Sequence, residues 1–71
     1  MELTPFVRDN IERVRNYVAK CRNVESVDFR LWRDEHGIYH AKFEYGRPAE
    51  GTIYHAVYGA IANVLMPLEE L

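Results

Sequence analysis

Residues 27–45, VDFRLWRDEHGIYHAKFEY, decide the fold that the sequence predicts. Apolar and polar side chains alternate on both sides of a central turn, as they do in a β-hairpin with one buried face. Asp34 and Gly37 suit a type I turn followed by a left-handed residue, which makes a three-residue loop. We therefore expect two antiparallel strands, over residues 24–33 and 38–45.

The length of the loop sets the register of the hairpin. With three loop residues the apolar positions of the two strands face one another, whereas a two-residue loop would pair apolar with polar positions. Turn chemistry and alternation thus agree on one register. The predicted pairs on the apolar face are Leu31–Ala41, Phe29–Phe43 and Val27–Tyr45. The polar face is predicted to carry Arg30, Trp32, His40 and Lys42, with Trp32 opposite His40.

A helix is predicted before the hairpin, over residues 5–22. Thr4 and Pro5 match an N-cap followed by proline in the first turn, and Asn23 tolerates the left-handed conformation that ends a helix. Apolar residues recur at the helical spacing of three and four. This stripe consists of Val7, Ile11, Val14, Val18 and Cys21. Because the stripe faces the core, we expect Cys21 to be a small buried side chain.

A second helix is predicted from the capping residue Thr52 to about Met66, where Pro67 should stop it. Residues 45–51 before it are expected to form a loop because they are rich in glycine and proline. The segment from 51 to 68 contains no lysine, arginine, aspartate or glutamate. The second helix is therefore apolar on most of its sides, which predicts that most of its sides are buried.

One hairpin and one helix cannot bury all of this apolar surface. A first stripe is expected to cover the hairpin and consists of Ile53, Val57, Ala60, Ile61 and Val64. A second stripe remains, which consists of Tyr54, Tyr58, Ala62 and Leu65. Together with the nearby Gly59 it is the predicted interface. A two-stranded sheet with two open edges also needs completion, which edge-to-edge joining of hairpins would provide. The sequence therefore predicts a homodimer, with or without a second protein as partner.

The size and charge of the chain are consistent with this prediction. Seventy-one residues predict one domain over 1–71, of class α+β and order αββα. A chain of this size buries only about 60% of its unfolded surface, so association would help to stabilise it. The net charge of −2 divides into seven basic against five acidic side chains in residues 1–33 and two against six in residues 34–71. An acidic chain argues against a dedicated nucleic-acid binder.

The expected location is the cytoplasm. The only cysteine, Cys21, can form no disulfide within the chain, and sparse cysteine is typical of a reducing compartment. The start of the chain lacks the pattern of a secretory signal. A membrane span is not favoured, because two tyrosines, a histidine, an asparagine and a threonine interrupt the apolar segment.

The sequence predicts neither a metal site nor a catalytic centre. His36 lies in the turn, His40 on the polar face and His55 on the second helix, and no pair of them has the spacing of a zinc motif. A reactive cysteine needs a base beside it, which the core position expected for Cys21 does not supply. We therefore expect a protein without cofactors that is not an enzyme.

The polar hairpin face is a second candidate binding surface. Trp32 combines there with Arg30, His40 and Lys42, and aromatic and arginine side chains are enriched at interfaces. Such a face can also stack a nucleic-acid base. The sequence thus favours a small interaction protein, such as a regulator, an inhibitor or an accessory subunit. The alternative is an RNA- or DNA-binding protein that uses this face and the arginines of the first helix.

The element order resembles that of two families. It is similar to part of the ribosome-hibernation factor fold, in which a helix, three consecutive strands and a helix follow a first strand. Residues 52–57, TIYHAV, resemble the aromatic–alanine start of that family's last helix. The order also resembles the lambda-type phage head-completion protein. Two strands of the hibernation factors have no counterpart in the predicted hairpin, and their last helix is charged. No functional residue is therefore carried over.

Overall fold

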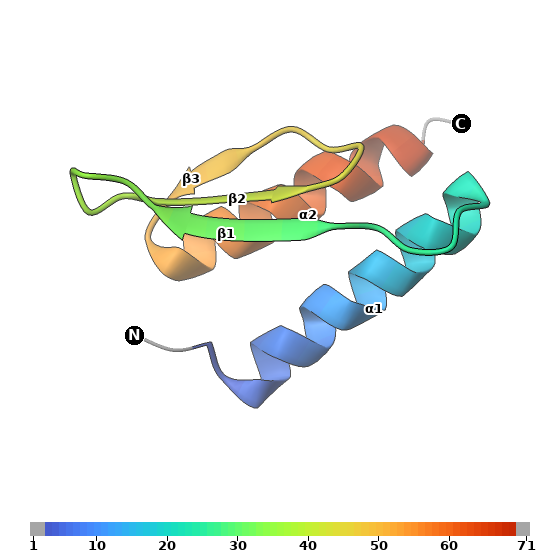
Figure 1. Ribbon diagram of the computed structural model, residues 1–71, viewed down its shortest axis with the longest axis horizontal. Coiled ribbons are helices and arrows are strands. Elements are labelled where there is room, and N and C mark those ends of the chain that lie inside the picture. The colour runs from blue at the N-terminus through green and yellow to red at the C-terminus, as the bar shows by residue number, and fades with distance from the viewer. Residues whose placement is uncertain (1–2, 70–71) are drawn as a thin grey trace.

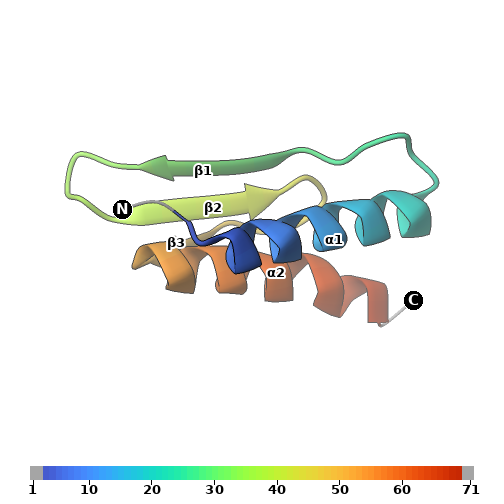
Figure 2. The same ribbon diagram turned by 90° about the horizontal axis from the view of Figure 1, so that it is seen from below.

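The chain folds into one layer of helices and one layer of sheet. The computed structural model describes residues 3–69. The elements are α1 (Pro5–Arg22), β1 (Phe29–Arg33), β2 (Tyr39–Phe43), β3 (Ala49–Gly51) and α2 (Ile53–Glu69). The strands form one antiparallel sheet in the order β1-β2-β3. Both helices lie on the same face of this sheet (Figures 1 and 2). The α+β class is confirmed, and the prediction of two strands is wrong because the structure has three.

Helix α1 begins and ends as predicted. The Thr4 hydroxyl accepts a hydrogen bond from the Val7 amide at 3.2 Å, and Asn23 adopts the left-handed conformation with φ of 56°. The expectation that Cys21 is buried is wrong, because its side chain is exposed. The last turn of α1 extends beyond the start of β1 (Figure 2), so the sheet does not cover it. Ala19 is the last buried residue of α1.

The hairpin turn has the predicted chemistry. The Asp34 carboxylate accepts hydrogen bonds from the amides of His36 at 2.8 Å and Ile38 at 3.0 Å. Gly37 takes a φ of 81°, which glycine adopts without steric cost. The pairs Phe29–Phe43 and Leu31–Ala41 are confirmed, as is the position of Trp32 opposite His40.

The predicted pair Val27–Tyr45 is wrong because the strands are shorter than expected. The Glu44 amide still donates to the Asp28 carbonyl at 2.8 Å, but Tyr45 then takes a φ of 74° and turns the chain away from β1. The Tyr45 ring is exposed, with the Arg22 guanidinium 4.9 Å from its centre. Val27 is buried on the linker between α1 and β1.

The predicted loop over 45–51 contains the third strand. The Gly46 amide donates to the Phe43 carbonyl at 3.0 Å and closes a turn that reverses the chain. The Asn63 side chain on α2 then donates to the carbonyls of Arg47 and Pro48, each at 3.2 Å. These two bonds hold the returning segment beside β2, where Ala49 pairs with Ala41. Tertiary contacts with α2 thus make a strand from residues whose local preference is a loop.

Helix α2 starts at the predicted cap and continues past the predicted end. The Thr52 hydroxyl accepts from the His55 amide at 3.3 Å. The helix includes Pro67, so the expected stop at Met66 is wrong. Pro67 lies in the final turn, where proline removes a single hydrogen bond. The core between the layers is built from buried residues of α1, β2 and α2 and of the linker between α1 and β1. These residues are Val7, Ile11, Val18, Ala19, Val27, Ala41, Phe43, Ile53, Ala56, Val57, Ala60 and Val64.

Candidate binding surfaces

The sheet face that the helices leave open carries the first candidate site. We call it the sheet surface and define it by Arg30 and Trp32 of β1, His40 and Lys42 of β2, Asp34 of the turn and Glu50 of β3. Antiparallel pairing places Arg30 opposite Lys42, Trp32 opposite His40, and His40 opposite Glu50. The structure therefore brings together all four residues predicted for this face. It adds two carboxylates to them.

His40 contacts three other side chains of the sheet surface. Its ring is stacked on Trp32 with a centroid distance of 5.3 Å and an angle of 9° between the planes. Its Nε2 atom lies 2.8 Å from the Asp34 carboxylate, and its Nδ1 atom lies 3.8 Å from the Glu50 carboxylate. The hydrogen bond from His40 lowers the pKa of Asp34, and the amides of Ile38 and His36 lower it further.

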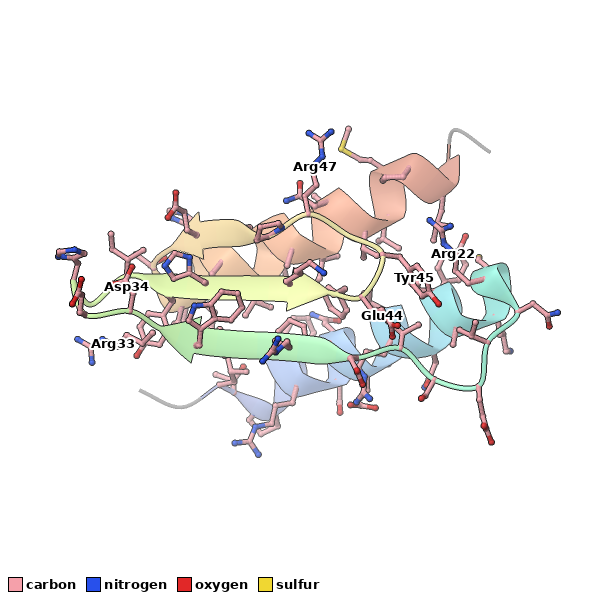
Figure 3. The ribbon with its side chains drawn as sticks, turned by 45° about the horizontal axis from the view of Figure 1, so that its top comes forward. Arg22, Arg33, Asp34, Glu44, Tyr45 and Arg47 are labelled. Carbon is pink, nitrogen blue, oxygen red and sulfur yellow. The ribbon has the colours of Figure 1, made fainter. Side chains whose placement is uncertain are left out.

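The charges of the sheet surface are mixed. Arg30 and Lys42 face each other near the middle of the hairpin. Acidic groups lie around them, with Asp34 at the turn and Glu44 at the opposite end of the hairpin (Figure 3). The Glu44 carboxylate accepts a hydrogen bond from the Asp28 amide at 3.1 Å. The two cationic side chains therefore lie between acidic side chains at both ends of the hairpin.

The second candidate site lies on the outer side of the two helices. We call it the helix surface and define it by Tyr58, Ala62 and Leu65 of α2 with Val14 and Tyr17 of α1. The Asn10 side chain on α1 donates to the Tyr58 hydroxyl at 3.4 Å, which joins the helices. A shallow groove beside this contact is lined by Arg13, Val14, Tyr17 and Leu65. Tyr58 remains 42% exposed and Tyr17 54% exposed.

The other two residues of the predicted interface lie elsewhere. Tyr54 is half-buried at the hairpin end of α2, beside Ile38 and Tyr39. Gly59 faces β3, and a Cβ atom added to it would lie 2.7 Å from the Cβ atom of Ala49. The sequence predicted one interface from a helical stripe of four of these residues and the nearby Gly59. The third strand separates them, because it covers the side of α2 that contains Gly59.

Two members of the sheet surface were missed from the sequence. Asp34 was assigned only to the turn, although it has the same even-numbered position along the strand as Trp32 and therefore lies on the same face. That alternation was a usable signal. Glu50 had no such signal, because its position opposite His40 depends on the third strand.

The described residues, 3–69, contain neither a metal-binding cluster nor a membrane-spanning helix. In this range no group of three histidine, cysteine, aspartate or glutamate side chains is placed to hold a metal ion. No helix within it has the length and apolar character needed to cross a membrane. Comparisons of the chain with protein-family models, curated proteins and solved structures find no match.

Proposed function

We propose that this protein acts by binding another protein chain, as a homodimer with or without a different protein partner. The observation that carries the proposal is the apolar helix surface. Helix α2 contains no charged residue between 51 and 68, and yet its Tyr58 is 42% exposed, and Tyr17 on the neighbouring part of α1 is 54% exposed. Contiguous exposed apolar surface of this kind marks interaction sites in soluble proteins.

The residue types of the helix surface also suit protein recognition. Tyrosine buries a large rigid ring and keeps a hydroxyl for hydrogen bonding, which makes it common at the centre of interfaces. Tyr17 and Tyr58 flank the groove that contains Leu65, and Arg13 lies at its rim. A partner side chain that fills this groove would cover the apolar part and leave the arginine at the edge.

The mixed charge of the sheet surface supports protein binding over nucleic-acid binding. Phosphate recognition depends on the number of cations that can neutralise the backbone. Here Asp34 and Glu50 lie on either side of His40, and Glu44 lies next to the strand that carries Lys42. One ring face of Trp32 is already stacked on His40, which leaves less of the indole for a base.

The test compares complexes formed by the wild type, Tyr58→Glu and His55→Glu. His55 is the matched control because it is an exposed residue of α2 whose Cβ atom lies near Gly51. Light scattering reports self-association, and affinity capture from the native host with measured stoichiometry reports other partners. We expect at least one of these two associations, the one that uses the helix surface, to be lost or at least tenfold weaker in Tyr58→Glu, since burying an unpaired charge costs about 2 kcal/mol or more. His55→Glu should behave like the wild type.

Two results would contradict the proposal. One is a wild-type chain that stays monomeric and retains no protein at stoichiometric yield. The other is that Tyr58→Glu and His55→Glu have equal effects on self-association and equal effects on the capture of other proteins. Circular dichroism must show that both variants keep the wild-type helix content, so that a loss of binding is not a loss of folding.

A further inference from the structure

Strand β1 has an open edge along its whole length. It is the first strand in the order β1-β2-β3, so only one of its sides is paired within residues 3–69. Backbone bonds at Asp28–Glu44 and Asp34–Ile38 show that even-numbered residues of β1 point their amides and carbonyls toward β2. In an antiparallel ladder the alternate residues point the other way. Leu31 and Arg33 therefore direct their backbone groups to the open edge.

The two edges of the sheet differ in their protection. The opposite edge, β3, is three residues long and follows Pro48, and both features discourage pairing with another chain. Strand β1 has five residues and contains no proline or glycine. Helix α1 lies beyond β1 on the side away from β2 (Figure 1), in the layer below the sheet. An added strand would therefore extend the sheet above α1.

A second copy of β1 is the occupant that fits this edge. Two-fold antiparallel pairing permits a small set of registers, each centred on one residue of β1. Three of them place like charges face to face: Arg30 against Arg30, Asp28 against Asp34, or Arg33 against Arg33. The registers centred on Phe29 and on Trp32 avoid these pairs, but the Phe29-centred register sets residues 30–33 of β1 opposite residues 25–28 of the linker instead of a second β1. The register centred on Trp32 keeps β1 opposite β1. It sets Arg30 of each chain opposite Asp34 of the other.

The same register continues the ring stack. Trp32 is stacked on His40 by one face of its indole, so the other face points to the open edge. In the Trp32-centred register the two tryptophans form a non-hydrogen-bonded pair, the arrangement in which side chains of opposite strands lie closest. The four rings would then lie in one stack, in the order His40, Trp32 of one copy and Trp32, His40 of the other. Charge thus leaves the registers centred on Phe29 and Trp32, and strand overlap and aromatic packing select the one centred on Trp32.

We propose that two copies of this chain pair along β1 in the Trp32-centred register and form one continuous sheet. This inference rests on the proposed function and deepens it, because it names the partner and the contact. It uses a surface separate from the helix surface. A failure of β1 pairing therefore leaves the binding role of Tyr58 and Leu65 intact.

Single-cysteine variants test the register directly. In a Cys21→Ser background we would introduce Trp32→Cys, Leu31→Cys or Arg30→Cys and oxidise each protein mildly. Directly opposite residues have the Cα separation that a disulfide needs. We expect a disulfide-linked dimer from Trp32→Cys in high yield and little from the other two. Cross-linking that is strongest at position 30 or 31 would overturn the proposal.

Charge reversal tests the same pairing without removing Trp32. Arg30→Glu would face Asp34 of the second copy, whereas Arg47→Glu makes the same charge change at an exposed position before β3, at the opposite edge of the sheet. We expect self-association to weaken by about tenfold in Arg30→Glu and little in Arg47→Glu. Trp32 is the only tryptophan, so an exciton signal between two indoles should appear with dimer concentration. A monomeric wild type, or a β1 edge that pairs with another protein instead, would refute the second copy as partner.

Discussion

Asp34 connects the hairpin turn to the sheet surface. One oxygen of its carboxylate accepts the amides of His36 and Ile38, and the other lies 2.8 Å from Nε2 of His40. All three contacts favour the charged carboxylate, and the His40 contact does so most. The pKa of Asp34 in the folded chain is therefore below its ordinary value, and Asp34 contributes stability only while it is ionised.

The charge of Asp34 should make the stability depend on pH in the acidic range. The lowered folded pKa means that this contribution is fully present above the unfolded pKa and is lost as pH falls through the folded pKa. We expect Asp34→Asn to unfold at lower denaturant concentration than the wild type at neutral pH. The gap between the two should close as both are acidified. Urea titrations at a series of pH values, followed by circular dichroism, measure this gap.

Glu35→Gln is the matched control for Asp34. Glu35 is the next residue of the turn, and its side chain is 88% exposed. The substitution Glu35→Gln removes the same charge as Asp34→Asn. Its variant should have the wild-type midpoint at every pH. An Asp34→Asn gap that stays constant down to the lowest pH would show that the carboxylate acts through turn geometry alone.

At the scale of elements, α2 and β3 depend on a close approach at Gly59. A Cβ atom at this position would lie 2.7 Å from the Cβ atom of Ala49, closer than two carbon atoms can pack. Gly59→Ala gains about 1 kcal/mol of helix propensity. Overpacking against the strand costs about 1–3 kcal/mol. We expect a net loss of stability, seen as a lower midpoint in urea.

A double-mutant cycle isolates this contact. Ala49→Gly removes the methyl group that Gly59→Ala would strike, so the second substitution should become neutral or stabilising in that background. The free energies of unfolding of the four proteins give the coupling between the two positions. Equal effects of Gly59→Ala in both backgrounds would mean that α2 moves away from β3 at little cost.

The sequence predicted the local parts of the fold and missed those that depend on distant residues. The turn at Asp34 and Gly37 and the caps at Thr4 and Thr52 follow from neighbouring residues, and all were confirmed. The third strand was missed because its support comes from Asn63, which lies fourteen residues after Ala49 and has no local signal.

The two candidate sites also differ in how far local sequence patterns could predict them. The sheet surface follows from strand alternation, so Arg30, Trp32, His40 and Lys42 were grouped correctly. Only part of the interface predicted on the second helix lies on one surface. Helical spacing shows which residues share a side of a helix, but not which element covers that side. Gly59 belongs to the contact with β3, and the strand that covers it was not visible in the sequence.

On the scale of the whole molecule, the β1 edge and the helix surface together limit how copies of the chain can assemble. Each can make a two-fold contact, and a molecule that uses two different two-fold contacts with its own copies builds a closed tetramer or an open fibre. Pairing through β1 alone closes at the dimer. With β1 paired to the second copy, the helix surface of Tyr58 and Leu65 is left open for a different protein.

This division predicts how stability depends on protein concentration. A dimer contact stabilises only the folded chain, so each tenfold rise in concentration above the dissociation constant adds up to about 1.4 kcal/mol per dimer. We expect the urea midpoint to rise with concentration in the wild type and in Tyr58→Glu, and to begin to rise only at about tenfold higher concentration in Arg30→Glu. Light scattering on the same samples should level off at the mass of a dimer. A mass that continues to grow, or a midpoint that Tyr58→Glu makes independent of concentration, would place self-association on the helix surface instead.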